Sequence, residues 1–216
     1  RGVQRLSDVS FDLRAGEILG VAAVAGNGQE ELAEVLVGIR AASGGDVVLS
    51  GRSVTRLRVR ARRLAGIAYV SADRKHEGLA SAVLGRASVR YGSPSDPASS
   101  LSGGNQQRVV IGRETIGRPA VLIASQPTRG VDIRGIADIH DLLRRAREDG
   151  TAIVLFSEEL DELRDLSDRI LVLHRGRVAG ECGAGASRAE IGALMLGRHD
   201  DENPTTPGDS TTGGDR

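Results

Sequence analysis

Apolar positions in this chain recur in two patterns that alternate along it. Short, nearly continuous apolar runs stop at glycine or at polar residues, and longer amphipathic segments separate them. The runs are typical of strands that are buried on both faces, and the amphipathic segments are typical of helices. Repeated strand–helix–strand units of this kind predict an α/β domain built on a largely parallel sheet.

Most predicted elements end where the sequence supplies a glycine, a proline or a polar cluster. Strands are predicted at residues 6–13, 16–25, 46–50, 66–70, 121–124, 152–156, 170–173 and 177–180. Helices are predicted at residues 29–37, from about Asn105 onward, and at 136–148. The last two strands flank His174, Arg175 and Gly176, so a hairpin is expected there.

Composition limits the classes of protein that fit. The chain has 216 residues, of which 39% are hydrophobic, so it can bury one substantial core. Lys plus Arg and Asp plus Glu number 29 each, and this zero balance argues against nucleic-acid binding. Cys182 is the single cysteine, which excludes an intramolecular disulfide and fits a reducing compartment. Neither a secretory signal nor an apolar run of roughly 20 residues is found, and the start at Arg1 leads us to expect a piece of a longer protein.

A glycine-rich turn follows the second predicted strand and precedes a predicted helix. A phosphate-binding loop has the pattern G-x-x-x-x-G-K-[ST], in which backbone N–H groups and Lys hold the phosphates and the hydroxyl holds Mg²⁺. Residues 23–30 keep this spacing, with Ala23 at the first glycine, Gln29 at the lysine and Glu30 at the hydroxyl, and the only lysine of the chain, Lys75, is distant in sequence. A plain strand–helix turn is the alternative. The candidate nucleotide-binding residues are Gly26, Asn27, Gly28, Gln29 and Glu30.

A glycine pair precedes the helix predicted from about Asn105. Ser102 comes directly before Gly103 and Gly104, so its hydroxyl and the following backbone N–H groups can face an anion at the helix N-terminus. A serine cap on an ordinary loop is the alternative. Residues 101–108 resemble the signature motif of ABC-transporter ATPases, in the form typical of simple-sugar and nucleoside importers. The candidate signature residues are Leu101, Ser102, Gly103, Gly104, Asn105 and Gln106.

The resemblance extends from about residue 6 to residue 197. The chain is similar to the C-terminal, degenerate nucleotide-binding domain of tandem-domain simple-sugar and nucleoside importer ATPases. This implies an ABC-type P-loop ATPase domain over residues 1–198, with a RecA-like parallel core, an antiparallel β subdomain and a helical subdomain at about residues 75–115. We expect that helical subdomain to be shortened, because residues 91–100 have a loop-like composition. We expect the polar tail at residues 199–216 to be disordered.

Three further positions follow from the resemblance, and they depart from the family's catalytic residues. The family ends one apolar strand in Asp-Glu, for Mg²⁺ and for the attacking water, and Ser125 and Gln126 stand there. A His after the next strand senses the terminal phosphate in the family, and Glu158 replaces it. Because a neutral amide cannot accept a proton from water, and a general base contributes about 10²–10⁴-fold, this chain alone should hydrolyse ATP poorly.

Asp132 matches the D-loop, which crosses the dimer seam in the family. The resemblance thus implies that the chain donates its signature in trans to ATP held by a competent partner domain. The partners implied are that domain, as the N-terminal half of the same original polypeptide, permease transmembrane subunits and, indirectly, an extracytoplasmic solute-binding protein. ATP is the implied ligand, with Mg²⁺ at the composite site formed with the partner's Walker motifs. The implied location is peripheral, at the cytoplasmic face of the plasma membrane.

Other interpretations stay open for the chain and for some of its residues. A non-hydrolytic pseudo-ATPase that serves as a structural or regulatory interaction module also fits the lost catalytic groups. A ribosome-acting ABC factor is disfavoured, because such proteins are rich in lysine. The four histidines lack metal-ligand spacing, so no metal site is predicted within the chain itself. The arginine run at residues 56–63 and the acidic residues Asp161, Glu162 and Asp165 are predicted to lie on exposed helix faces.

Overall fold

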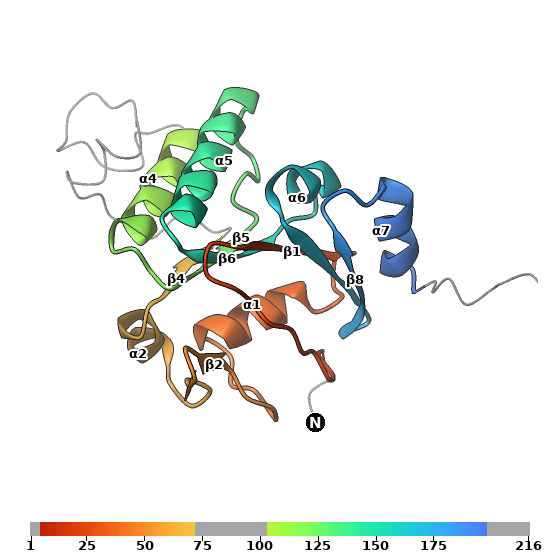
Figure 1. The fold of residues 1–216 in the computed structure, drawn as a ribbon, viewed down its shortest axis with the longest axis horizontal. Coiled ribbons are helices and arrows are strands. Elements are labelled where there is room, and N and C mark those ends of the chain that lie inside the picture. Colours follow the sequence, from red (N-terminus) through yellow and green to blue (C-terminus); the bar gives the residue numbers. More distant parts are fainter. Residues whose placement is uncertain (1–4, 72–102, 198–216) are drawn as a thin grey trace, which may run out of the picture.

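A six-stranded sheet lies at the centre of the molecule, and helices cover both of its faces (Figure 1). The computed structural model describes residues 5–71 and 103–197. The strand order is β4-β5-β6-β1-β7-β8, with parallel neighbours throughout except for the antiparallel pair β7 and β8. The strands are β1 (Ile18–Ala23), β4 (Ile67–Val70), β5 (Val121–Ser125), β6 (Ala152–Phe156), β7 (Arg169–His174) and β8 (Arg177–Gly183).

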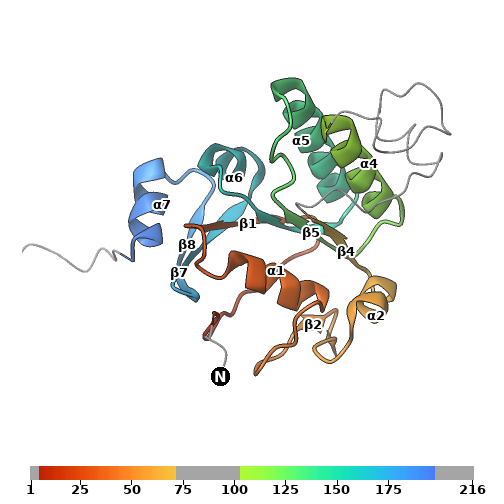
Figure 2. The ribbon, with the colours of Figure 1, turned by 180° about the vertical axis from the view of Figure 1, so that it is seen from behind.

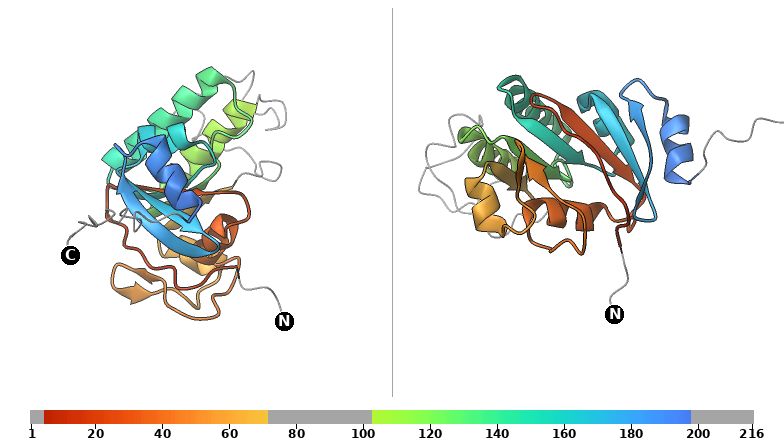
Figure 3. Two further views of the ribbon diagram at one scale, coloured as in Figure 1. Left: turned by 90° about the vertical axis from the view of Figure 1, so that its right-hand side faces the viewer. Right: turned by 60° about the horizontal axis from the view of Figure 1, so that its bottom comes forward.

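The helices form two layers with the sheet between them. One face carries α4 (Gly103–Ile116), α5 (Ile133–Glu148) and α6 (Leu160–Leu166), and the opposite face carries α1 (Gln29–Val37) and α2 (Val59–Leu64) (Figure 2). A small antiparallel sheet of β2 (Val48–Leu49) and β3 (Arg52–Ser53) lies beside α1 and α2. The last helix, α7 (Arg188–Met195), packs next to β7 and β8 (Figure 3).

The core occupies both sides of the sheet because each central strand is covered twice. Ile18 and Ile153 belong to the apolar cluster under α4, α5 and α6, whereas Leu19 and Val154 belong to the cluster on the α1 side. All four side chains are at most 1% exposed. This double burial explains why the strands are nearly continuous apolar runs.

The α/β class and the parallel core that the sequence predicts are confirmed. The strand predicted at residues 16–25 is β1, and the helix predicted at 29–37 is α1. The helix expected from about Asn105 is α4. The hairpin is also confirmed, since Arg175 and Gly176 join β7 to β8 with φ values of 48° and 75°, which are typical of a two-residue hairpin turn.

The strand predicted at residues 6–13 is wrong. Between residues 5 and 17 the described chain contains no strand, although Leu6, Val9, Phe11 and Leu13 are partly buried against the α1-side cluster. The alternation of apolar residues therefore reflects one-sided burial of a loop, and alternation alone cannot distinguish this from pairing with a neighbouring strand.

The predicted start of the helix at residues 136–148 is also wrong, because α5 begins at Ile133. Asp132 precedes that first residue, and its Oδ1 accepts a hydrogen bond from the Gly135 N–H at 2.8 Å. An aspartate cap of this kind satisfies one of the unpaired N–H groups of the first turn. The sequence prediction used the apolar spacing and overlooked the cap.

The exposed face predicted for the arginine run is wrong at Arg62, which is 2% exposed. Its guanidinium donates hydrogen bonds to the carbonyl oxygens of Thr55 at 2.9 Å and Leu57 at 3.0 Å. It also donates to the carbonyl oxygens of Val35 and Leu36 in the last turn of α1. Arg62 therefore joins α2 to the end of α1, while the other arginines of the run are exposed as predicted.

Glu162 was also predicted to be exposed and is buried. The α6 helix forms as expected, and Asp161 and Asp165 are exposed, but Glu162 is only 6% exposed. His140 Nε2 of α5 lies 3.1 Å from Glu162 Oε1. Because α6 packs against the sheet beside α5, one side of this short helix is buried, and Glu162 lies on that side.

Some of the predicted features lie outside the described residues. These are the part of the helical subdomain at residues 75–102, the signature residues Leu101 and Ser102, and the disordered tail at residues 199–216. They stay predictions. Among the helices within the described ranges, none combines the length and the hydropathy that crossing a membrane would need.

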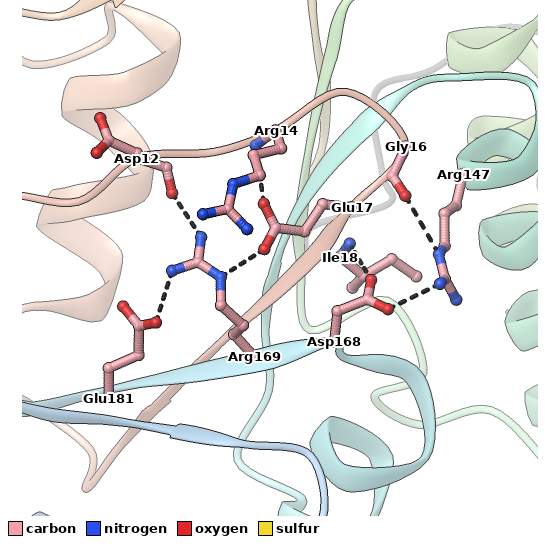
Figure 4. A network of polar contacts seen from close by, with 9 residues as sticks. All are labelled: Asp12, Arg14, Gly16, Glu17, Ile18, Arg147, Asp168, Arg169 and Glu181. Atoms are coloured by element: carbon pink, nitrogen blue, oxygen red, sulfur yellow. Dashed lines mark hydrogen bonds and ion pairs between the residues drawn. The ribbon is translucent and has the colours of Figure 1, made fainter.

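A network of ion pairs fixes the amino ends of β1 and β7 (Figure 4). Arg169 Nε donates to Glu17 Oε1 at 2.5 Å, and Arg147 Nη2 donates to Asp168 Oδ1 at 2.7 Å. The second oxygen of Asp168 accepts the N–H of Ile18 at 2.9 Å. The network therefore aligns neighbouring strands at the sheet edge opposite the carboxyl ends of the strands.

We expect Glu17→Gln to lower the free energy of unfolding by about 1.5–3 kcal/mol at neutral pH, the range for hydrogen bonds to charged groups. Burial alone would raise the pKa of Glu17, but hydrogen bonds from the Arg169 side chain and the Arg14 N–H hold that pKa below its ordinary value. The stabilisation is therefore present above the ordinary carboxyl pKa of about 4.3 and is lost as pH falls through the lower folded-state value. Urea unfolding should show a gap between the two proteins that closes on acidification. Glu148→Gln, at an exposed position, should show no gap, and a pH-independent gap for Glu17→Gln would contradict the prediction.

Candidate functional site

The loop between β1 and α1 has the backbone shape that the glycine spacing predicts. It begins after Ala23 and ends at Gln29, and Gly26 and Gly28 adopt φ values of 83° and 103°. Glycine adopts this left-handed conformation without the steric cost that other residues meet. A Cβ atom on Gly28 would also lie 2.7 Å from Leu6 Cδ2, so a side chain has no room there. The strand–turn–helix context of a phosphate-binding loop is present.

Asn27 joins this loop to the hairpin turn between β7 and β8 by hydrogen bonds. Its Oδ1 accepts the N–H of Arg175 at 2.6 Å, and its carbonyl oxygen accepts the N–H of Gly176 at 3.0 Å. Its Nδ2 donates to the carbonyl oxygen of Val24 at 2.9 Å. The Gly176 carbonyl in turn accepts the N–H of Ser7 at 2.8 Å. The hairpin turn therefore joins three separate segments, because it bonds to Asn27 on one side and to Ser7 on the other.

The side chains at the lysine and hydroxyl positions do not fit a triphosphate with Mg²⁺. Gln29 is 8% exposed, and its Oε1 has no hydrogen-bond partner within the part of the chain that the structure describes. Glu30 is exposed and, with Glu31, places carboxylates in the first turn of α1. The positive end of a helix dipole favours an anion, but these carboxylates oppose a phosphate there. Over the described ranges, no cluster of three or more His, Cys, Asp or Glu side chains could hold a metal ion.

The ends of β5 and β6 place the other altered positions at the same carboxyl edge of the sheet, because β5, β6 and β1 are neighbours. Ser125 is the last residue of β5, and Gln126 follows it with a φ of 49°. The Gln126 N–H donates to the Phe156 carbonyl oxygen at 2.8 Å, and its Oε1 accepts the Glu158 N–H at 3.4 Å. Gln126 thus bridges two strand ends, and neither it nor Ser125 can act as a carboxylate base toward water.

The N-terminus of α4 carries the described part of the signature. Gly103 and Gly104 are its first residues, and Asn105 and Gln106 complete the first turn, which contains no acidic residue. The first four N–H groups of a helix have no acceptor within the helix, so they can bind an anion. In this respect α4 is the opposite of α1, whose first turn is acidic.

Asp132 lies at the start of α5, which packs directly against α4 (Figures 1 and 2). Its carboxylate caps α5, as described above, and so has a defined place beside the signature helix. Arg108 of α4 forms an ion pair with Asp138 of α5, and it also donates to Asn105 Oδ1. The structure therefore brings the D-loop position and the signature glycines onto one pair of helices.

Several of these features were not predicted from the sequence. The Asn105–Arg108 contact could have been anticipated, because residues three apart on a helix are neighbours. The Arg108–Asp138 pair could not, since it depends on which helices pack together. Gln107 was also missed: it is fully buried, and within the described residues neither of its amide atoms has a hydrogen-bond partner.

The site residues therefore form two groups with different chemistry. The first group is the loop at residues 26–30 with Ser125, Gln126 and Glu158. It has the backbone of a phosphate loop, but glutamine and glutamate stand at the lysine and hydroxyl positions, and glutamine stands at the position of the base. The second group is the start of α4 with Asp132, where the backbone N–H groups of a helix N-terminus lie beside the capped start of α5.

The sequence is similar to that of a known family and of several curated import proteins. The family model described as ABC transporter matches residues 6–129. The glucose import ATP-binding protein TsgD13 of Haloferax volcanii is 37% identical over 93% of this chain and 43% of its own length. The guanosine import ATP-binding protein NupO of Bacillus subtilis is 34% identical over 91% of this chain and 46% of its length. This chain thus spans less than half the length of these relatives.

Solved structures confirm the fold. An ATP-binding subunit of an ABC transporter superposes with a TM-score of 0.75 at 19% identity, covering 88% of this chain and 92% of the other. An ATP-binding cassette in a dimeric, post-hydrolysis state with ADP and Pi superposes with a TM-score of 0.73 at 21% identity, covering 85% of this chain and 92% of the other.

Proposed function

Because the chain belongs to the ABC transporter family, we propose that it is a nucleotide-binding part of an importer for simple sugars or nucleosides. In this proposal the signature at residues 101–106 acts in trans on ATP held by a competent partner domain. The observation that carries the proposal is the contrast between two helix ends. The first turn of α4 is free of acidic residues, whereas that of α1 contains Glu30 and Glu31. A terminal phosphate is therefore favoured at α4 and opposed at α1.

The lengths of the import relatives support a partner within the same original polypeptide. They are more than twice as long as the matched chain, so they have room for a second domain of this size. We place the competent domain in the N-terminal half. The permease subunits are the membrane partners in this proposal, with an extracytoplasmic solute-binding protein as an indirect one. The chain would then lie peripherally at the cytoplasmic face of the plasma membrane.

The chemistry of the proposal divides the work between the two domains. Water attacks the terminal phosphorus of the partner's ATP, the bond to the ADP oxygen breaks, and phosphate is released. The N–H groups at Gly103 and Gly104 would stabilise charge on the transferring phosphoryl group. Mg²⁺ and the base would come from the partner's Walker motifs, because Gln29, Ser125 and Gln126 cannot supply them. The chain's own loop would form a second site that binds ATP weakly or not at all.

A second candidate is a pseudo-ATPase that acts only as a structural or regulatory module. It is favoured by one observation, that Gln126 bridges β5 and β6 through both its N–H and its Oε1 instead of standing free for catalysis. In this candidate the chain binds its partner without affecting turnover.

The two candidates are separated by measuring ATP hydrolysis for the chain, for its competent counterpart and for the two together. The proposal predicts negligible turnover by the chain alone and a rate for the mixture about tenfold or more above that of the counterpart, since positioned electrostatic donors contribute at least this much. A complex that forms without stimulation would leave the structural module as the function. Vigorous hydrolysis by the chain alone would contradict both.

A further inference from the structure

Two glycines let α4 and α5 approach each other closely at their N-terminal ends. A Cβ on Gly104 would lie 3.7 Å from Gly135 Cα, and a Cβ on Gly135 would lie 3.6 Å from Gly104 Cα. The side chain of Val131, in the loop before α5, fits against both glycines. Its Cγ1 would be 3.1 Å from a Cβ on Gly104 and 2.5 Å from one on Gly135. The second distance is far shorter than an ordinary contact between carbon atoms, which is about 3.5–4.0 Å.

The two helices are held together again one turn further along. Arg108 follows Gly104 by one helical turn, and Asp138 follows Gly135 in the same way; their side chains form an ion pair. Arg108 is well shielded, with 10% of its side chain exposed. The N-terminal halves of α4 and α5 are therefore joined at two levels, first by close packing and then by charge.

We infer that Gly135 and Val131 are positioning residues that set the signature glycines in place for the partner's nucleotide; this inference rests on the proposed function. Val131 lies close to Gly104, and the absence of a side chain at Gly135 leaves the room in which that valine and the start of α4 pack. The Gly135 N–H also binds the Asp132 carboxylate, so the D-loop position is fixed by the same residue. Signature and D-loop then move as one unit when the partner domain docks.

The test is Gly135→Ala in the mixed-domain ATPase assay. The new methyl group must displace Val131 by about 1 Å to reach an ordinary contact distance. Because a misplacement of about 1 Å can lower a rate about hundredfold, we expect kcat of the mixture to fall about tenfold to hundredfold. The KM for ATP should change less than about threefold, because the partner's own loop makes most of the ground-state contacts.

A double variant tests whether the lost activity can be restored. Val131→Ala/Gly135→Ala removes the methyl group that the new Cβ would meet, and the remaining neighbours, Asp132 Oδ1 at 3.4 Å and Gly104 Cα at 3.6 Å, are at ordinary distances. The double variant should regain most of the lost kcat. Gly117→Ala is the matched control, because it lies directly after α4 and a Cβ there would meet no atom within 4 Å. It should leave kcat unchanged.

Thermal unfolding separates positioning from loss of fold. A folded Gly135→Ala protein with an unchanged kcat, or a double variant no more active than the single one, would overturn the inference. If Gly135→Ala does not fold, Asp138→Asn is tested in its place, because this change weakens the ion pair with Arg108 without adding bulk. A kcat that falls about threefold would then support the inference, and an unchanged kcat would overturn it. If even the unaltered chain fails to stimulate its counterpart, the proposed function itself is wrong.

Discussion

Ser102→Arg is expected to reduce the ATPase rate of the mixed domains at least about hundredfold, which is the cost of removing one donor from a site that stabilises a developing negative charge. The substitution removes the hydroxyl that directly precedes Gly103 in the sequence and adds a long side chain where the proposed function places the partner's terminal phosphate. Phosphate release at saturating ATP is the measurement.

The control is Ser10→Arg, which adds the same bulk and charge at an exposed serine remote in sequence from α4. Its rate should equal that of the unaltered mixture. Association of the two domains is measured in parallel, since an arginine at position 102 could also weaken pairing. A paired complex of the Ser102→Arg chain that hydrolyses ATP at the normal rate would exclude a role of the signature in trans.

Arg62→Ala is expected to lower the free energy of unfolding by at least about 3 kcal/mol, because each buried acceptor that is left without a donor costs about 1–3 kcal/mol. Its guanidinium serves four carbonyl oxygens, and each loses a buried donor in the variant. A cavity of the size of the side chain adds to the loss. Urea unfolding followed by circular dichroism gives the free energy, and an unchanged m-value shows that the unfolded state is the same.

Two further variants test whether the stability depends on the planar guanidinium group of Arg62. Arg62→Lys keeps the positive charge but cannot reach four acceptors at once, so it should lose a large part of the same stability. Arg60→Ala removes an exposed arginine of the same helix and should change stability by less than about 0.5 kcal/mol. If Arg60→Ala and Arg62→Ala were equally destabilising, the bonds to the end of α1 would not be the cause.

The parallel core could be predicted because its strands leave a strong pattern in the sequence. Residues 121–124 and 152–156 are apolar at nearly every position, which happens when helices cover both faces of a sheet. The segment at residues 6–13 has an equally regular pattern and yet forms no strand. Its partner would have to come from elsewhere in the chain, and no local pattern contains that information.

The burial of individual charged side chains could not be predicted from the local sequence pattern either. Arg62 and its exposed neighbour Arg60 are the same amino acid in the same run, and only the carbonyl oxygens at the end of α1 distinguish their surroundings. Glu162 differs from Asp161 for a similar reason, since His140 approaches it from another helix. Such pairs form between segments far apart in sequence.

For the candidate site, motif spacing located each loop but not how the loops are held. The pattern at residues 23–30 correctly predicted a turn between a strand and a helix. It could not show that Asn27 bonds to Arg175 and Gly176, which follow it by about 150 positions. The roles of Ser125, Gln126 and Glu158 in catalysis stay predictions.

The bonds made by Asn27 have a consequence for which substitutions the domain tolerates. Since Asn27 bonds the β1–α1 connection to the hairpin turn, that connection stabilises the fold in addition to forming the predicted phosphate loop. Glu30 is exposed and takes no part in these bonds, so its side chain can change without breaking them, whereas the buried Gln29 has less freedom to change. Under the proposed function, a cassette built in this way would lose its own catalysis and still present a well-ordered surface to its companion domain.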